Sequence, residues 1–353
     1  MPVPLRTCRR QWGRRSSDSA RTRRRRRFHC GQTYASVLYR HLPRNTAVPA
    51  RGKGRAPLHQ IAVFSSSTRD DLTIGDGIAL LADAGVRADA TVAATLAKGA
   101  AFEVAVDQVT PQIATTLRAS AEAEQIDVNV VPRDARRKSL LIADMDSTIV
   151  TSETLDDMAT IAGLSDAILP ITARAMRGEL DFEAALDERL ALFAGQPASL
   201  VDDALAAVTL SAGAEVLVRT MRRSGSSCYL ISGGFTAITG PIAARCGFNG
   251  DHANILDIKD GRLLGSVTKP VLDANAKARF LAHYCAELGI SAAEAACIGD
   301  GANDLPMLQT AGFGVAYQGK PLLRQHIALQ LNHTDLRGLL FLQGYHEEAF
   351  VSG

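Results

Sequence analysis

Short apolar runs alternate along the chain with stretches whose apolar residues recur at helical spacing. A short continuous apolar run is typical of a strand that is buried on both faces of a parallel sheet. Runs of this kind predict strands at Ser139–Ala143, Cys228–Ile231, Ala295–Ile298 and Gly312–Ala316. We therefore expect an α/β fold with a doubly wound parallel sheet in residues 136–353, and ligands at the carboxyl ends of its strands.

An inserted helical cap is predicted at about 152–225, after the first of these strands. Apolar positions such as Leu186, Leu190 and Phe193 recur there at helical spacing. Residues 274–288 predict a further helix, and Asp260-Gly261 between two apolar segments is a strong hairpin signal.

Residues 57–135 have a pattern of their own and predict a small ferredoxin-like α/β module. The predicted elements are strands at His59–Ser66, Phe102–Val106 and Ile126–Val131, with helices at 76–84 and 114–124. The polar residues at 132–138 have the composition of a linker between domains.

Charge is distributed unevenly, which separates residues 1–56 from the rest. Residues 1–55 hold 15 arginines, one lysine and one acid, Asp18, a formal charge of +15, so the remainder of a chain with net charge +2 carries −13. A run such as Arg23–Arg27 repels itself, and we expect a basic, disordered tail. The acidic remainder argues against nucleic-acid binding by the whole protein.

Composition also bounds the cellular setting. The chain is 46% hydrophobic and 22% charged, and no stretch reaches the length of apolar residues that a spanning helix needs. Its six cysteines form no Cys-x-x-Cys pair, so reduced thiols are expected. We expect a cytoplasmic protein with no membrane contact, and organellar import through the Arg-rich leader is the alternative.

Polar side chains follow three of the predicted strands. Asp144 and Asp146 come directly after the first, and two carboxylates two residues apart on extended backbone can face one site. Ser232-Gly233-Gly234 follows the second, and such a loop lets backbone N–H groups approach an anion. Each motif alone is common in ordinary turns. The two motifs indicate a functional site because they occur together in one chain.

The third strand is followed by Gly299-Asp300-Gly301-Ala302-Asn303-Asp304, and Lys277 lies on the helix before it. Carboxylate and amide oxygens are the ligands that Mg²⁺ prefers, and glycines keep such a turn tight. Asp304 stands where a dinucleotide-binding loop needs a small residue, which argues against that loop. Further on, Gly319-Lys320 resembles the end of a P-loop, but Pro321 replaces the hydroxyl residue, and we expect an ordinary loop there.

These parts suit phosphate ester hydrolysis. A carboxylate that attacks a phosphoryl group meets like-charge repulsion, which a metal ion and a lysine offset. In this order the segments resemble the four motifs of the haloacid dehalogenase-like superfamily of phosphatases, over about residues 139–320. The segments are Asp144-x-Asp146-Ser147-Thr148, Ser232, Lys277 and Gly299-Asp300-Gly301-x-Asn303-Asp304.

The resemblance implies a role for each residue. Asp144 is then the nucleophile and a Mg²⁺ ligand, and Asp146 is the general acid and base, with its backbone carbonyl on the metal. Asp300 is a further metal ligand that Asp304 supports. The phosphoryl and substrate contacts implied are Ser232, Gly233, Lys277 and Asn303.

Glu153 and Arg189 indicate the substrate. A carboxylate for an ammonium group and a guanidinium for a carboxylate would match both ends of phosphoserine. The spacing resembles the phosphoserine phosphatase family, in which the positions of Glu153, Met176, Phe182 and Arg189 line the amino-acid pocket. This resemblance implies a Mg²⁺-dependent phosphoserine phosphatase of serine biosynthesis, and residues 57–135 resemble the amino-acid-binding regulatory modules that precede some of its members.

Two other functions stay open at this point. One is a related phosphomonoesterase acting on phosphohomoserine or another small phosphate ester. The other is an amino-acid-sensing regulatory protein with a vestigial phosphatase core, which the complete set of catalytic side chains counts against. Formation of a homodimer, and the ligand or role of the 57–135 module, are also open.

Overall fold

The computed structural model describes residues 59–177 and 179–352. The basic tail predicted for residues 1–56 lies outside this part of the chain. None of the helices in the described ranges is long and apolar enough to cross a membrane. Four cysteines in these ranges, Cys228, Cys246, Cys285 and Cys297, are buried free thiols.

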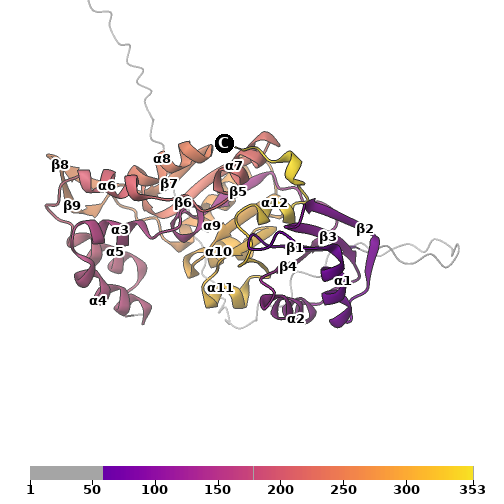
Figure 1. Ribbon diagram of the computed structural model, residues 1–353. Helices are drawn as coiled ribbons and strands as arrows, with labels where there is room; N and C mark the ends of the chain where they lie inside the picture. The colour runs from indigo at the N-terminus through magenta and orange to yellow at the C-terminus, as the bar shows by residue number, and fades with distance from the viewer. Residues whose placement is uncertain (1–58, 178, 353) are drawn as a thin grey trace, which may run out of the picture. The chain divides into compact units, whose positions relative to one another are not determined.

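Residues 60–132 form an antiparallel sheet of four strands with the sequence order β1-α1-β2-β3-α2-β4 (Figure 1). The strands lie in the order β2-β3-β1-β4, which is the ferredoxin-like arrangement that we predicted. The elements are β1 (Gln60–Ser65), α1 (Ile74–Asp83), β2 (Ala88–Ala97), β3 (Ala101–Val106), α2 (Pro111–Glu122) and β4 (Asp127–Pro132). The sequence pattern missed β2, because that strand is rich in alanine and mostly solvent-accessible.

A six-stranded parallel sheet forms the core of the remaining chain, as predicted. Its strand order is β12-β11-β10-β5-β6-β7, so the strands that precede the polar motifs lie side by side at its centre. The strands are β5 (Leu140–Ala143), β6 (Ser227–Phe235), β7 (Gly250–Asn254), β10 (Ala295–Gly299), β11 (Phe313–Tyr317) and β12 (Leu329–Leu331). The sequence analysis predicted the four inner strands and missed the edge strands β7 and β12.

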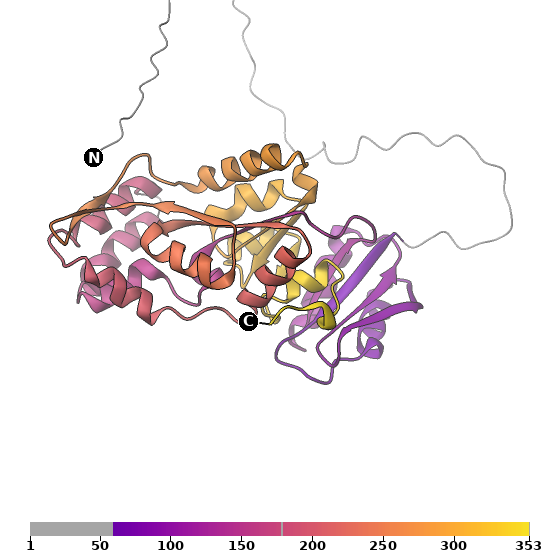
Figure 2. The same cartoon turned by 90° about the horizontal axis from the view of Figure 1, so that it is seen from above.

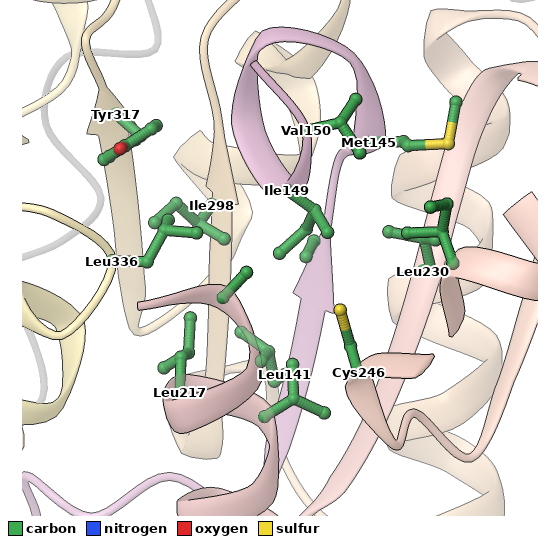
Figure 3. Packing of buried hydrophobic residues seen from close by; sticks show 14 of the residues in the cluster. Leu141, Met145, Ile149, Val150, Leu217, Leu230, Cys246, Ile298, Tyr317 and Leu336 are labelled. Carbon is green, nitrogen blue, oxygen red and sulfur yellow. The ribbon is translucent and has the colours of Figure 1, made fainter. Parts of the chain in front are cut away.

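Helices cover both faces of this sheet. Side chains of β5 alternate between the faces, so that Leu141 packs into one apolar cluster and Ile142 into the other. Figure 3 shows the first cluster, in which Leu217 and Cys246 lie on either side of Leu141. The helices are α7 (Ala214–Arg223), α8 (Thr236–Cys246), α9 (Ala274–Leu288), α10 (Leu305–Thr310), α11 (Pro321–His326) and α12 (Gly338–Leu342), with short turns η2 (Ala292–Glu294), η3 (Ala302–Asp304) and η4 (Glu347–Ala349).

The cap is built from two separate stretches of the chain. Its helices are α3 (Thr154–Ile161), α4 (Ser165–Met176), α5 (Phe182–Ala191) and α6 (Ser199–Ala207), and its hairpin is β8 (Leu256–Lys259) with β9 (Arg262–Val267). The N–H of Gly195 donates to the carbonyl of Leu263 at 2.8 Å, which joins the hairpin to the helices (Figure 1, Figure 2). Helix α7, which the sequence analysis placed in the cap, packs against β6 and α8 of the core.

Hydrogen bonds join the ferredoxin-like sheet to the segment around β12. The carboxylate of Asp127 accepts from the backbone N–H groups of Asn332, His333 and Thr334 at 2.8 to 3.0 Å. Asn129 exchanges two further hydrogen bonds with the backbone of Gln330, each of 2.8 Å. Residues 330–334 are therefore held in place by the module.

Candidate active site

The first carboxylates of the site stand where β5 ends. Asp144 continues the ladder, since its N–H donates to the carbonyl of Ile298 at 3.0 Å. The chain then enters an irregular turn, η1 (Met145–Ile149), in which Ser147 has a φ of 52°. This left-handed residue turns the chain back toward the sheet, so that both Asp144 and Asp146 face the carboxyl edge of the strands.

Asp146 is half-buried between the turn and β6. Its Oδ1 accepts from the Thr154 N–H at 2.9 Å, and its Oδ2 accepts from the Ser232 hydroxyl at 3.2 Å. Burial, and next the charge of Asp144, raises the pKa of Asp146 to about 7. A carboxyl with this pKa can both donate and accept a proton near neutral pH.

Lys277 reaches the centre of the site from α9 and is almost fully buried. Its Nζ lies 2.7 Å from Asp144 Oδ1 and 2.6 Å from Asp304 Oδ1. Burial alone would lower the pKa of this ammonium group, but the two carboxylates outweigh burial and raise it. Lys277 is therefore a fixed positive charge beside Asp144.

Three buried carboxylates, those of Asp144, Asp300 and Asp304, form a group that could hold a metal ion. One oxygen from each lies within 4.8 Å of the others. The N–H of Gly301 donates to Asp304 Oδ2 at 3.1 Å, which orients this carboxylate. Hard oxygen ligands at this spacing fit Mg²⁺, so the residues present suit the metal that the sequence analysis named.

The side chain of Asp304 packs so closely against the end of β10 that position 299 has room only for glycine. A Cβ atom on Gly299 would lie 2.3 Å from the carboxyl carbon of Asp304. The missing side chain thus lets Asp304 approach the end of β10 closely.

A cavity of about 200 Å³ brings most of the predicted residues together. Of the residues named from the sequence, those lining it are Asp144, Asp146, Glu153, Phe182, Arg189, Gly233, Asp300 and Asn303. Ser232 and Lys277 are buried directly behind this lining, in contact with Asp146 and Asp144. The side chain of Met176 lies outside what the structure describes.

The cap supplies the outer wall of the cavity. Arg189 lies on α5, where its Nε donates to the carbonyl of Ala185 at 3.2 Å. Burial lowers the pKa of its guanidinium, although Asp156 and Glu153 oppose that effect. Within the described ranges no carboxylate lies within 4 Å of Arg189, so the guanidinium can take an anionic ligand. The ring of Phe182 packs over Gly233. A Cβ atom added at position 233 would lie 3.1 Å from the Phe182 ring.

Lys320, which the sequence analysis assigned to an ordinary loop, lines the catalytic cavity. Its Nζ lies 3.0 Å from Asp300 Oδ2 and 3.5 Å from Glu153 Oε1. Its backbone N–H also donates to the carbonyl of Asp300 at 2.9 Å. Its position in the sequence could have identified it, because Lys320 lies in the loop after an apolar strand, as the other polar motifs do.

The sheet order, the cap and the row of aspartates are those of the haloacid dehalogenase-like hydrolases, and residues 141–309 match the model of that family. Phosphatases of this class are in general metal-dependent. A solved HAD family hydrolase from Salmonella enterica serovar Typhi covers 80% of this chain and 97% of its own, with a TM-score of 0.73 and 29% identity.

Curated relatives narrow the class. A phosphoserine phosphatase of Streptococcus thermophilus is 39% identical over 199 residues, 56% of this chain and 93% of that protein. A solved phosphoserine phosphatase carrying an analogue of its phospho-aspartyl intermediate is 35% identical, with a TM-score of 0.54, and covers 58% of this chain and 98% of its own. The chain therefore belongs to the phosphoserine phosphatase family.

The match to other relatives is partial. A phosphoserine phosphatase of Streptomyces coelicolor is 41% identical over 251 residues, which make up 70% of this chain and 61% of that protein. The corresponding enzyme of Mycobacterium tuberculosis is 39% identical over 233 residues, 66% of this chain and 57% of that protein. The chain thus spans about three fifths of the length of these two relatives.

Proposed function

We propose that this protein hydrolyses O-phospho-L-serine to L-serine and inorganic phosphate, in two steps through a phosphorylated Asp144. One observation carries the proposal: the nucleophile, the acid and two groups of opposite charge on the cap side, Glu153 and Arg189, line a single small cavity. The family relationship supports the same reaction.

In the first step a carboxylate oxygen of Asp144 attacks phosphorus, and the bond from phosphorus to the serine oxygen breaks. Lys277 offsets the repulsion between the carboxylate and the phosphoryl oxygens, because it is a permanent charge 2.7 Å from Asp144. Ser232 and the N–H of Gly233 hold the phosphoryl group. The leaving alkoxide takes the proton of Asp146, so serine departs neutral at that oxygen.

In the second step Asp146, now ionised, removes a proton from water. The resulting hydroxide attacks phosphorus, the acyl phosphate bond breaks, and Asp144 is restored with release of phosphate. The pKa of about 7 for Asp146 suits both halves of this cycle, because the group changes protonation state at little cost near neutral pH.

Asp144 and Asp300, with the backbone carbonyl of Asp146 and support from Asp304, are the groups that would hold Mg²⁺. An ion bound there would offset negative charge on the phosphoryl oxygens.

Residues on the cap side of the cavity select the substrate. Glu153 pairs with the ammonium group of phosphoserine, and Arg189 pairs with its carboxylate. Phe182 closes the cavity over Gly233 and excludes water from the reacting phosphoryl group. A homodimer and a cytoplasmic location remain predictions.

Phosphate release from L-phosphoserine, measured with Mg²⁺ and with EDTA, tests the reaction. We expect release only with the metal, and a higher kcat/KM for phosphoserine than for O-phosphohomoserine or phosphoethanolamine. Equal kcat/KM values across these three esters would contradict the assigned substrate, and no release from any of them would contradict the reaction class.

A further inference from the structure

Lys320 lies where two parts of the catalytic cavity meet, the row of aspartates and the carboxylate of Glu153. It lines the cavity together with Asp300 and Glu153. Its Nζ is 3.0 Å from Asp300 Oδ2 and 3.5 Å from Glu153 Oε1, so one ammonium group pairs with both carboxylates. Neither step of the proposed reaction uses Lys320, although both of its partners have a role there.

Backbone hydrogen bonds fix the position of Lys320. Its N–H donates to the carbonyl of Asp300 at 2.9 Å, and its own carbonyl accepts from the N–H of Leu323 at 2.9 Å, in the first turn of α11. The preceding residue, Gly319, packs closely against β11, since a Cβ atom there would lie 3.0 Å from the Cβ of Ala316. The Cα atom of Lys320 is therefore held beside the loop of Asp300, and only rotation of the side chain can move the ammonium group.

Glu153 depends on side-chain partners for its orientation. It stands at the N-cap of α3, and its side chain makes no capping hydrogen bond to that helix. The Ser147 hydroxyl donates to Glu153 Oε1 at 2.9 Å, and Lys320 Nζ approaches the same oxygen. Both contacts go to Oε1, which leaves Oε2 for an ammonium group in the cavity.

The charges of Asp300 and Glu153 would repel each other without Lys320. Both carboxylates lie within 3.5 Å of one nitrogen, and like charges this close to a common centre interact unfavourably. A cation between them replaces that repulsion with two attractions. Without it, Glu153, whose side chain is 48% exposed, could turn away from Asp300 into solvent.

We propose that Lys320 is a positioning residue, which holds Glu153 at the cavity wall where this carboxylate receives the ammonium group of the substrate. Lys320 thereby sets the preference for an amino-acid phosphate ester without taking part in phosphoryl transfer. This role rests on the proposed function, because it is defined by the binding of an ammonium group to Glu153.

Lys320→Met removes the charge and keeps an unbranched apolar side chain. At saturating Mg²⁺ the KM for L-phosphoserine should rise about two- to fivefold, the worth of a partly exposed ion pair, while kcat stays nearly unchanged. The kcat/KM for p-nitrophenyl phosphate, which has no ammonium group, should not change. Lys320→Arg keeps the charge and should keep most of the wild-type affinity. Lys259→Met is the matched control, because Lys259 is exposed at the end of β8 and lies outside the cavity lining.

A double-mutant cycle with Glu153→Gln shows whether Lys320 acts through Glu153. In the Glu153→Gln background, Lys320→Met should have no further effect on the KM for phosphoserine, because the carboxylate that Lys320 holds is gone. Equal effects of Lys320→Met with and without the Glu153 carboxylate would overturn the proposal. An effect seen only at limiting Mg²⁺ would overturn it too, since Lys320 would then act through Asp300.

The outcomes for the wild-type chain separate this role from the proposed function. A wild-type chain that releases no phosphate from phosphoserine would contradict the proposed function itself. An active wild type together with an unchanged KM in Lys320→Met would contradict only the role of Lys320. Thermal unfolding shows whether each variant is folded, and Lys320→Gln makes the same comparison if Lys320→Met is not.

Discussion

Asp144 and Asp146 are the same amino acid two positions apart, yet their surroundings divide the chemistry between them. Asp144 lies 2.7 Å from the Lys277 ammonium, a positive charge that offsets the repulsion between this carboxylate and an incoming phosphoryl group. Asp146 is half-buried next to Asp144, and desolvation together with the Asp144 charge raises its pKa to about 7, which favours proton transfer. Lys277 therefore contributes to the division as directly as the two carboxylates do.

Asp146→Asn should abolish turnover while binding of phosphoserine stays within a few-fold of wild type. The amide keeps the shape and the hydrogen bond from Thr154 but cannot carry the proton to the leaving group. General acid catalysis is worth about 10²- to 10⁴-fold in rate, so kcat should fall by at least the lower figure. Single-turnover kinetics and calorimetry measure the two quantities, and near-normal kcat would remove Asp146 from the proton-transfer role.

Arg189→Ala should lower kcat/KM for phosphoserine by about 10- to 100-fold, the usual loss for a charge-assisted hydrogen bond, and leave a plain phosphomonoester almost unaffected. The ratio of the two kcat/KM values is the measurement. Arg177→Ala is a matched control on the cap, because the Arg177 side chain is 59% exposed and pairs with Glu179. If the ratio does not change, Arg189 does not bind the carboxylate.

At the scale of elements, the inner strands and the motifs that follow them could be predicted because both signals are local. The run at β5 is apolar on both faces, and Asp144 follows it directly in the sequence. No such signal is present in the alanine-rich β2 or in the edge strand β7, whose residues are partly exposed. These strands form because they pair with neighbouring strands that are distant in the sequence.

The sequence pattern also predicted a hairpin at Asp260-Gly261 but could not place it on the cap. That assignment depends on contacts such as the one from Gly195 to Leu263, which join residues far apart in the chain. Lys320 escaped prediction for the same reason, because its contacts with Glu153 and Asp300 exist only once the sheet is assembled.

Gly299→Ala tests how tightly β10 packs against the loop that follows it. The added methyl group would lie 2.3 Å from the Asp304 carboxyl carbon, so the loop must shift. We expect a loss of about 1 to 3 kcal/mol in the free energy of unfolding, together with weaker Mg²⁺ binding. Gly75→Ala is the control, since a Cβ atom there meets its nearest neighbour at 3.5 Å and should leave stability unchanged or slightly raised. Urea unfolding that shows equal stability for both variants would contradict this packing argument.

At the scale of the whole described unit, many polar contacts join the ferredoxin-like module to the phosphatase core. Asp127 alone accepts three backbone N–H groups from residues 332–334, and that segment lines a cavity of about 710 Å³ that shares Asp300 and Lys320 with the catalytic cavity. Arg136 adds an ion pair of 2.6 Å with Glu103. The module therefore shapes a wall next to the catalytic residues, even though it supplies none of the catalytic groups named here.

Asp127→Ala should separate this role from catalysis. Removing the carboxylate leaves three N–H groups without their acceptor, and we expect a loss of about 2 to 5 kcal/mol in the free energy of unfolding. Because residues 332–334 lose their anchor while no catalytic group is removed, the loss should appear in stability more than in kcat. Asp107→Ala is the matched control: Asp107 is an exposed acid of the same module, and solvent screens its ion pair with Arg87, so its loss should change stability little. Urea unfolding and steady-state kinetics on the two variants make the comparison, and equal stabilities would mean that Asp127 does not anchor the module.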